Sequence, residues 1–205
     1  MDKLLFLPGI IIGLTFHEFA HAKAANLLGD PTPKLQGRVT LNPLAHIDII
    51  GFIALMIVGF GWGKPVQING SYFKNFKRDE IIVSISGVLM NLVLAILFAG
   101  ILKLMDVSAS EYFTTTSVGN YISQMVYGVI WINIILMVFN LMPIPPLDGF
   151  NVIAELAHLR EKGIYSQVYD KGPIILIILI IFNITDKIIG PVANFFMDSI
   201  LNIFF

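Results

Sequence analysis

The sequence predicts an all-α polytopic membrane protein with about four to six membrane segments. Hydrophobic residues make up 56% of the 205 residues, charged residues make up only 13%, and the mean hydropathy is +0.81. That charged fraction is about half that of a typical soluble domain. The uncharged runs Ile81–Leu102 and Tyr112–Leu147 are long enough to cross the hydrocarbon core, which takes about 20 residues. We therefore expect a single integral-membrane domain over residues 1–205, embedded in a lipid bilayer.

The first crossing is predicted at roughly residues 4–28. Its apolar character is interrupted by two histidines and a glutamate, His17, Glu18 and His21. A helix over this range crosses the bilayer only by placing these three side chains in or near the membrane. Ionisable groups at that depth are costly and indicate function by default.

The segment that follows, Ile49–Gly63, is uncharged, short for a crossing and rich in glycine. We expect a re-entrant element that returns to its side of origin, and a full crossing is the alternative. The flanking segments Leu35–Leu41 and Val66–Asn69 have strand-like character, so a short β-hairpin is a further alternative after the first helix.

The remaining crossings follow from the uncharged runs. Residues 81–102 form the most secure one, and the small residues Ser84, Ser86 and Gly87 would let another helix approach closely. The next crossing is expected at 121–142, because the proline-rich sequence after Leu141 cannot continue a regular helix. The C-terminal segment, about 172–205, spans obliquely or lies at the interface.

The basic residues set the expected orientation. The predicted loop 106–120 has no Lys or Arg, whereas the other face collects the basic residues if Ile49–Gly63 re-enters. Those residues are Lys34, Arg38, Lys64, Lys74, Lys77, Arg78, Arg160, Lys162 and Lys171. By the positive-inside rule that face is cytoplasmic, and the candidate active segments lie toward it.

Charge and cysteine content exclude several classes of function. The formal charge of -1 provides no basic field for nucleic acid. Because the chain has no cysteine, disulfides, thiolate metal sites and thiol nucleophiles are excluded. A metal would have to be held by His, Asp or Glu.

The sequence His-Glu-Phe-Ala-His at positions 17–21 carries the chemistry. His17 and His21 are one helical turn apart on the same face, which is the spacing that two metal ligands need. Glu18 is rotated away from the pair, so its carboxylate could reach a metal-bound water as a general base without being a ligand. The alternative is a pair of structural histidines that are satisfied by hydrogen bonds inside a polar bundle.

A hydrolytic zinc site needs a third protein ligand. His46, His158 and the carboxylates are candidates, and Asp148 is distinctive because it ends a long uncharged run beside Pro145-Pro146. Irregular backbone at membrane depth is tolerated where it lines an enclosed cavity. Alone, Asp148 would be interpreted as a helix N-cap; together with the two histidines it is the expected third ligand.

Two motifs resemble those of the site-2 proteases, which are intramembrane zinc metalloproteases. HEFAH at 17–21 is similar to the family's first zinc-binding signature, and NLMPIPPLDGF at 140–150 resembles its Asn-x-x-Pro-x-x-Pro-Leu-Asp-Gly signature. Segments at 37–48, 61–66 and 86–91 also match compact members, although Val88 replaces a common proline. The resemblance covers roughly residues 10–155, with no segment long enough for a PDZ domain.

The resemblance implies that His17, His21 and Asp148 bind one Zn²⁺ per chain and that Glu18 activates water for attack on a peptide carbonyl. The catalytic core would be about 4–155, and the expected substrates are transmembrane segments of membrane proteins, in regulated intramembrane proteolysis. The alternative function is a non-proteolytic metal-binding membrane protein, a transporter or an inactive scaffold of the same fold.

Two asparagines and two strand-like segments are secondary candidates. Asn140 and Asn91 could orient substrate or stabilise an oxyanion, with interhelical hydrogen bonding as the alternative. Leu35–Leu41 or Val66–Asn69 could pair with an unwound substrate as an added strand, unless the two close on each other as a hairpin. His46 could support a metal ligand, although pairing with nearby Asp48 is favoured.

Overall fold

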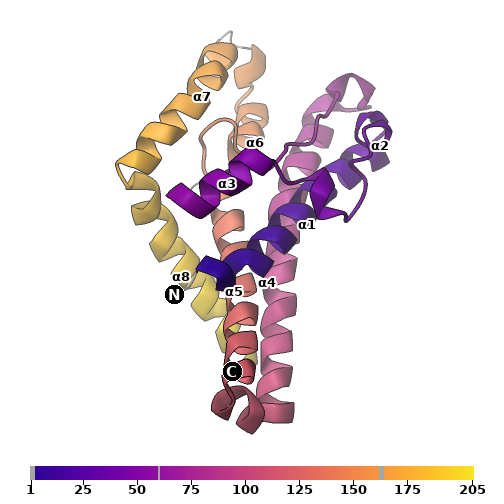
Figure 1. Cartoon of the computed structure of the whole chain (residues 1–205). Helices are drawn as coiled ribbons and strands as arrows, with labels where there is room; N and C mark the ends of the chain where they lie inside the picture. Colours follow the sequence, from indigo (N-terminus) through magenta and orange to yellow (C-terminus); the bar gives the residue numbers. More distant parts are fainter. Residues whose placement is uncertain (1–2, 60, 162–163) are drawn as a thin grey trace.

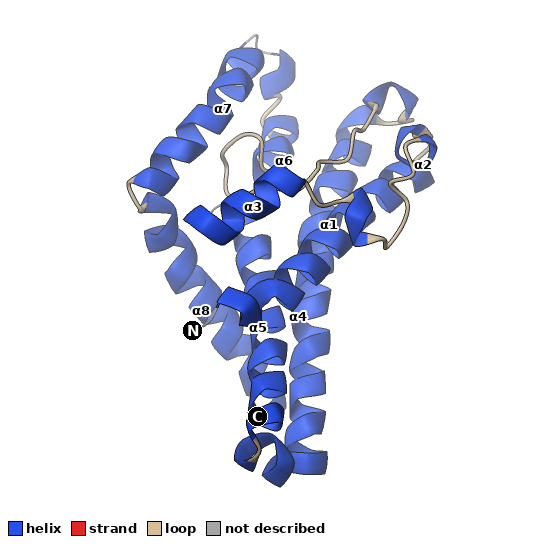
Figure 2. Cartoon of the chain, in the orientation of Figure 1, coloured by secondary structure: helices blue, strands red, loops and turns tan. Residues whose placement is uncertain are grey.

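The computed structural model describes residues 3–59, 61–161 and 164–205, and these ranges are almost entirely helical (Figures 1 and 2). Their only β-type pairing is an isolated antiparallel bridge between Ile47 and Gly63. The α-helices are α1 (Leu7–Leu27), α2 (Thr32–Leu35), α3 (Ile49–Val58), α4 (Phe76–Thr115), α5 (Ser117–Asn140), α6 (Asp148–Leu156), α7 (Ile164–Ile181) and α8 (Ile184–Phe204). The 3-10 turns are η1 (Lys3–Phe6), η2 (Pro43–Ala45), η3 (Gly70–Tyr72) and η4 (Leu159–Glu161).

The core is built on a hairpin of α4 and α5, against which α1 and α8 pack (Figure 1). Most of its buried apolar side chains come from α4, α5 and α8, and they include Val88, Ala95, Ile130, Ile134, Ala193 and Met197. α1 crosses α5 at Gly9, where an added Cβ would lie 2.9 Å from the backbone oxygen of Gly128. This close approach fixes α1, which carries the histidines, against the hairpin.

Among the described residues, three helices are long and apolar enough to cross a membrane: Leu4–Leu27, α4 and α5. α7 and α8 are bent by 79° and together qualify as a fourth, broken span. A count of four falls at the low end of the predicted four to six, and a count of three falls below it. The C-terminal segment, whose path the sequence left open, turns at Asn183, which has a positive φ of 54°.

The predicted loop at 106–120 is wrong, because this stretch is helical. α4 continues to Thr115, interrupted only by non-helical backbone angles at Ala109, and α5 begins at Ser117. The chain reverses at Thr116, whose side chain accepts a hydrogen bond from the Gly119 N–H and caps α5. Hydropathy indicates where a chain leaves the hydrocarbon, but the caps decide where its helices end.

The two ends of the segment that was predicted to re-enter the membrane meet at the Ile47–Gly63 bridge. Asp48 caps α3 by accepting a hydrogen bond of 2.7 Å from the Gly51 N–H. Beyond α3, the Lys64 N–H donates to the His46 carbonyl over 2.7 Å, next to the Ile47–Gly63 bridge. The ends of the excursion are therefore side by side.

The strand-like interpretation of Leu35–Leu41 and Val66–Asn69 is wrong: neither segment forms a strand. The first begins at the end of α2. The second donates backbone N–H groups to carboxylates instead of to a neighbouring strand, from Val66 to Glu18 and from Asn69 to Asp30. Strand propensity forms a strand only where a partner strand is available.

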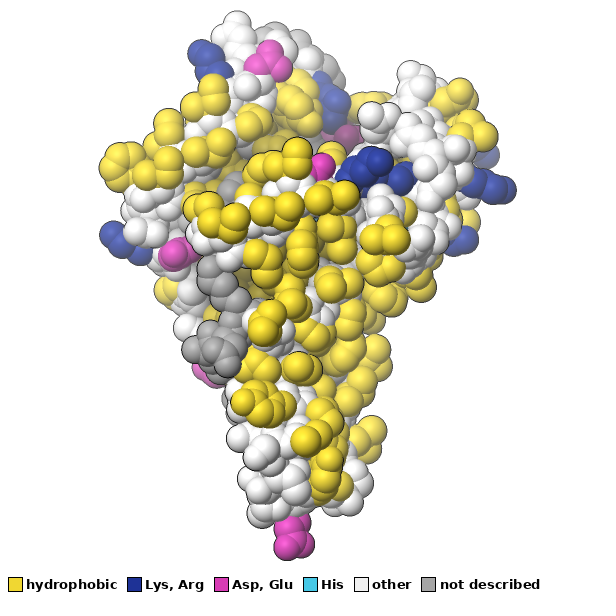
Figure 3. All heavy atoms as spheres, viewed as in Figure 1, with side chains coloured by type: hydrophobic (Ala, Val, Ile, Leu, Met, Phe, Trp, Pro, Cys, Tyr) yellow, Lys and Arg dark blue, Asp and Glu magenta, His cyan; other side chains and the backbone are white. Residues whose placement is uncertain are grey.

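The charged side chains are unevenly distributed along the molecular surface. In Figure 3 hydrophobic side chains cover much of the visible face, Lys and Arg lie in the broad upper half, and an acidic side chain lies at the narrow tip. The tip is the turn between α4 and α5 (Figure 1). The spans make this an integral membrane protein, and the side on which the basic half lies stays a prediction.

Candidate metal centre

The two histidines lie on α1 as the sequence spacing predicts. Both side chains are buried, and their Nε2 atoms are 3.0 Å apart. The rings meet edge to face with an interplanar angle of 88°, so that both Nε2 atoms point toward one place. The local helix geometry is sufficient to produce this pair.

The opposite ring nitrogens are held by α4. Nδ1 of His17 lies 2.7 Å from the amide oxygen of Asn91, and Nδ1 of His21 lies 2.8 Å from the backbone carbonyl of Val83. Since both partners are acceptors, each Nδ1 is the donor, which leaves the Nε2 lone pairs for a metal. Asn91 is oriented in turn, because its Nδ2 donates to Asn133 and to the Gly13 carbonyl.

Asp148 completes a group of three. Its Oδ2 lies 3.3 Å from the Nε2 atoms of both His17 and His21, and it is buried without a hydrogen-bond partner. Within the described ranges, these are the three side chains whose ligand atoms all lie within 4.8 Å of one another. Zn–ligand bonds of about 2.0–2.1 Å in a tetrahedron separate two ligand atoms by about 3.3 Å. The donor set and its spacing therefore fit zinc.

Two glycines let the backbone approach this group. A Cβ at Gly149 would lie 2.2 Å from the Leu141 carbonyl, so only glycine lets the proline-containing loop fold back and place Asp148. A Cβ at Gly87 would lie 2.5 Å from Nε2 of His21. The small residues predicted to admit another helix thus bring α4 directly onto the histidines.

Glu18 lies outside the ligand group, beside the segment that follows Gly63. Its Oε2 accepts a hydrogen bond of 2.9 Å from the Val66 N–H and is 3.7 Å from the guanidinium of Arg38. Arg38 is buried and also donates to the Lys64 carbonyl. The sequence placed Arg38 among the cytoplasmic charges and in the family-like segment 37–48, without a role at the site. Its contact with Glu18 joins segments too far apart in the chain to be recognised by spacing.

The histidines, Glu18 and Asp148 line a cavity of about 610 Å³, which gives the site room for a peptide segment. Asn140 also borders the cavity, and its amide donates to the Leu136 carbonyl one turn earlier. Asn91 is completely buried and makes the interhelical hydrogen bonds of the alternative interpretation. The structure therefore brings Asn140 to the site and places Asn91 behind His17.

His46 does not pair with Asp48, because Asp48 caps α3 instead. The His46 ring is fully buried, with Nε2 2.8 Å from the Thr40 carbonyl. Burial lowers the pKa of His46 below its ordinary value of 6.5, and the nearby Arg38 charge lowers the pKa further. The lowered pKa favours the neutral imidazole at pH 7. We interpret His46 as a structural group that packs against the loop containing Arg38 and Thr40.

Comparison with known proteins gives matches that extend over the whole chain. The sequence profile described as "Peptidase family M50" matches residues 106–182, which include Asp148. The chain is 35% identical over 213 residues to the Bacillus subtilis (strain 168) protein named "Putative zinc metalloprotease YwhC", covering 100% of this chain and 96% of that protein. No solved structure gives a significant match.

More distant relatives carry a similar name. The Mycolicibacterium smegmatis protein "Putative zinc metalloprotease Rip2" is 26% identical over 201 residues, covering 95% of this chain and 73% of that protein. The Mycobacterium tuberculosis H37Rv protein of the same name is 25% identical over 193 residues, covering 87% and 66%.

The membrane spans, the His-His-Asp group and these relatives together define a zinc metallopeptidase of the membrane. This makes the chain a hydrolase, and zinc is its cofactor. The chain belongs to peptidase family M50, the site-2 protease family.

Proposed function

We propose that this protein is an intramembrane metallopeptidase that hydrolyses peptide bonds within or near transmembrane segments of other membrane proteins. The observation that carries the proposal is the convergence of three ligand atoms within 4.8 Å, on the wall of a cavity that Glu18 also lines. His17, His21 and Asp148 hold the zinc. When bound, zinc polarises the substrate carbonyl and lowers the pKa of water to about 7.

Glu18 is the proposed general base. It takes a proton from the attacking water and returns it to the leaving amine. Its carboxylate follows His17 directly in α1 but is held by the Val66 N–H and Arg38, away from the ligand atoms. This division of roles leaves the carboxylate available for proton transfer instead of coordination.

Asn140 is the proposed substrate-orienting residue. It stands at the cavity wall at the end of α5, on the chain segment that leads to Asp148. Its carbonyl oxygen can accept from a substrate N–H while its amide group donates to Leu136. Asn91, which was the second candidate, supports the site through His17 and does not itself line the cavity.

The cleaved proteins are proposed to reach the site within the membrane, with water entering from the cytoplasmic side, in regulated intramembrane proteolysis. The basic half of the molecule supports this orientation through the positive-inside rule (Figure 3). Labelling Lys74 or Lys77 from the cytoplasmic side checks the orientation, and labelling from the opposite side would contradict it.

The experiment that tests the proposed function measures cleavage of a panel of transmembrane peptides in detergent, together with bound zinc. Glu18→Gln is expected to keep zinc and lose cleavage, whereas Asp148→Asn is expected to lose both. If the wild type binds zinc and Glu18→Gln leaves its activity unchanged, the assignment of the base is wrong.

A further inference from the structure

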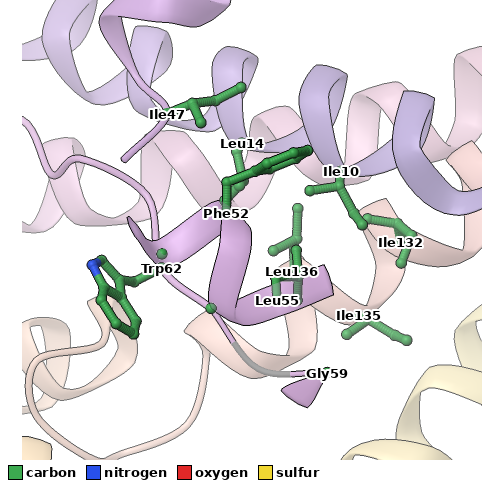
Figure 4. A pocket seen from close by; sticks show the side chains of 12 residues that line it. Ile10, Leu14, Ile47, Phe52, Leu55, Gly59, Trp62, Ile132, Ile135 and Leu136 are labelled. Carbon is green, nitrogen blue, oxygen red and sulfur yellow. The ribbon is translucent and has the colours of Figure 1, made fainter. Parts of the chain in front are cut away.

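A second cavity, of about 280 Å³, lies beside the metal centre and is almost wholly apolar (Figure 4). In Figure 4 side chains from three helices gather around it. They are Ile10 and Leu14 of α1, Phe52 and Leu55 of α3, and Ile132 and Leu136 of α5. The cavity is also lined by Ile47, Gly51, Ile135 and, in the returning segment, Gly59, Gly61 and Trp62.

This apolar cavity and the catalytic cavity lie in line along the same three segments. On α1, Leu14 lines the first cavity and Glu18, four residues later, lines the second. On α5, Leu136 and Asn140 are related in the same way. Residues four apart occupy one helix face and are separated by about 6 Å along the axis.

The returning segment connects the cavities in the same order. Trp62 borders the apolar cavity, and Pro65 and Val66 border the catalytic one. Three independent stretches of chain therefore form a wall that is continuous from one cavity to the other. A peptide lying along this wall with one bond at the metal centre would have a neighbouring side chain beside the apolar cavity.

The size and lining of the apolar cavity determine what it can hold. An apolar cavity of about 150 Å³ stays dry and binds a molecule as large as benzene. At about 280 Å³ this cavity has room for an aromatic or branched aliphatic side chain. An extended chain advances about 3.3 Å per residue, so the offset of about 6 Å corresponds to roughly two residues.

We propose that the apolar cavity is a specificity subsite that accepts a bulky apolar side chain of the substrate, about two residues from the bond at the metal centre. The inference rests on the proposed peptidase function and adds the substrate feature that the site selects. Side chains of this kind are abundant in transmembrane segments. Their transfer into a dry apolar wall is favourable once the segment unwinds.

The position of α3 favours a substrate side chain over a lipid chain. Phe52 and Leu55 line the cavity, whereas Ile53 and Ile57 of the same helix are exposed. An acyl chain can lie against this exposed face without entering the cavity. The cavity instead continues the wall of the catalytic site.

Peptide hydroxamates test the subsite without a known substrate, because the hydroxamate group binds the zinc. We would measure their affinity for the full-length, zinc-loaded chain in detergent by displacement of a fluorescent hydroxamate. The series carries phenylalanine or alanine at the first, second or third residue from the hydroxamate. One position is expected to bind phenylalanine at least about tenfold more tightly than alanine.

Variants assign that preference to the cavity. Leu55→Trp fills it from α3, and Ile10→Phe fills it from α1, in case the first substitution prevents folding. Both are expected to abolish the preference for phenylalanine and to keep the affinity for the alanine compound. Ile53→Trp is the matched control, because Ile53 is 51% exposed on the opposite side of α3, and it should keep the preference.

The outcomes separate this inference from the function on which it rests. If no position in the wild type prefers phenylalanine, or if the filling variants leave the preference intact, the cavity is not a substrate subsite. If the folded variants lose affinity equally for all compounds, the cavity has a purely structural role, and the inference is overturned as well. If no hydroxamate binds the zinc-loaded wild type, the proposed metal centre itself fails.

Discussion

The amide oxygen of Asn91 lies 2.7 Å from Nδ1 of His17, across the contact between α4 and α1. This hydrogen bond sets the orientation of the imidazole, and a fully buried partner, Asn133, holds Asn91 in place. Bundle packing therefore fixes the direction of a proposed metal ligand.

Removing this support is expected to weaken zinc binding. Asn91→Leu should lower the affinity for zinc by about tenfold to a hundredfold, since His17 loses the acceptor that fixes its tautomer. Titration against a competing chelator measures the affinity. Asn120→Leu, on the exposed part of α5, is the control, and equal affinities in all three proteins would contradict the role of Asn91.

Gly87→Ala is expected to abolish zinc binding, because the new methyl group would lie 2.5 Å from Nε2 of His21. Gly100→Ala is a matched control in the same helix. Its Cβ would meet its nearest neighbour, a ring carbon of Phe204, at an ordinary 3.5 Å. Zinc content after purification distinguishes the two, and a Gly87→Ala protein with full zinc would refute the close approach of α4.

Arg38→Gln is expected to reduce kcat by about tenfold to a hundredfold while the chain keeps its zinc. Arg38 lies 3.7 Å from the Glu18 carboxylate and donates to the Lys64 carbonyl, so its loss frees the proposed base to rotate. Single-turnover cleavage and metal analysis provide the two readouts. Lys34→Gln, an exposed change of the same charge, should have little effect, and a similar loss there would point to charge alone.

The stability of the protein is expected to fall in mild acid through His46. Because the pKa of this buried imidazole is below 6.5, the unfolded chain takes up the proton at a higher pH than the folded chain does. The stabilisation is complete above about pH 6.5 and is lost as the pH falls further, at no more than about 1.4 kcal/mol per pH unit.

Thermal unfolding of the zinc-loaded protein between about pH 7 and 5 measures this effect. The Tm of His46→Gln should decline less steeply than that of the wild type, because the substituted side chain does not titrate. His158→Gln, at an exposed position, should follow the wild type. Parallel declines in all three proteins would show that other groups cause the acid sensitivity.

The features predictable from sequence are those with a local cause. Helical periodicity is enough to place His17 and His21 on one face, and uncharged length is enough to locate the spans around 4–28, 81–102 and 121–142. Asp148 could also be predicted from the sequence, for a different reason. A carboxylate that follows a long uncharged run and lies beside prolines is costly to place near the membrane, which indicates a functional role. The family resemblance identified that role as metal binding.

Other features depended on contacts that no spacing encodes. The break between α4 and α5 lies at Thr116, which caps α5, and is not marked by a change in hydropathy. The Val66 N–H donates a hydrogen bond to Glu18 instead of to a neighbouring strand. The close approach of Gly87 to His21 and the two neighbouring cavities along α1 and α5 both arise where helices that are far apart in the sequence pack together. Sequence was enough to predict the proposed ligands and the membrane environment, because side-chain chemistry and helical repeat are local. Tertiary structure decided which groups hydrogen-bond the two histidines, which groups hold Glu18 and where the apolar cavity lies. These features depend on which helix faces meet.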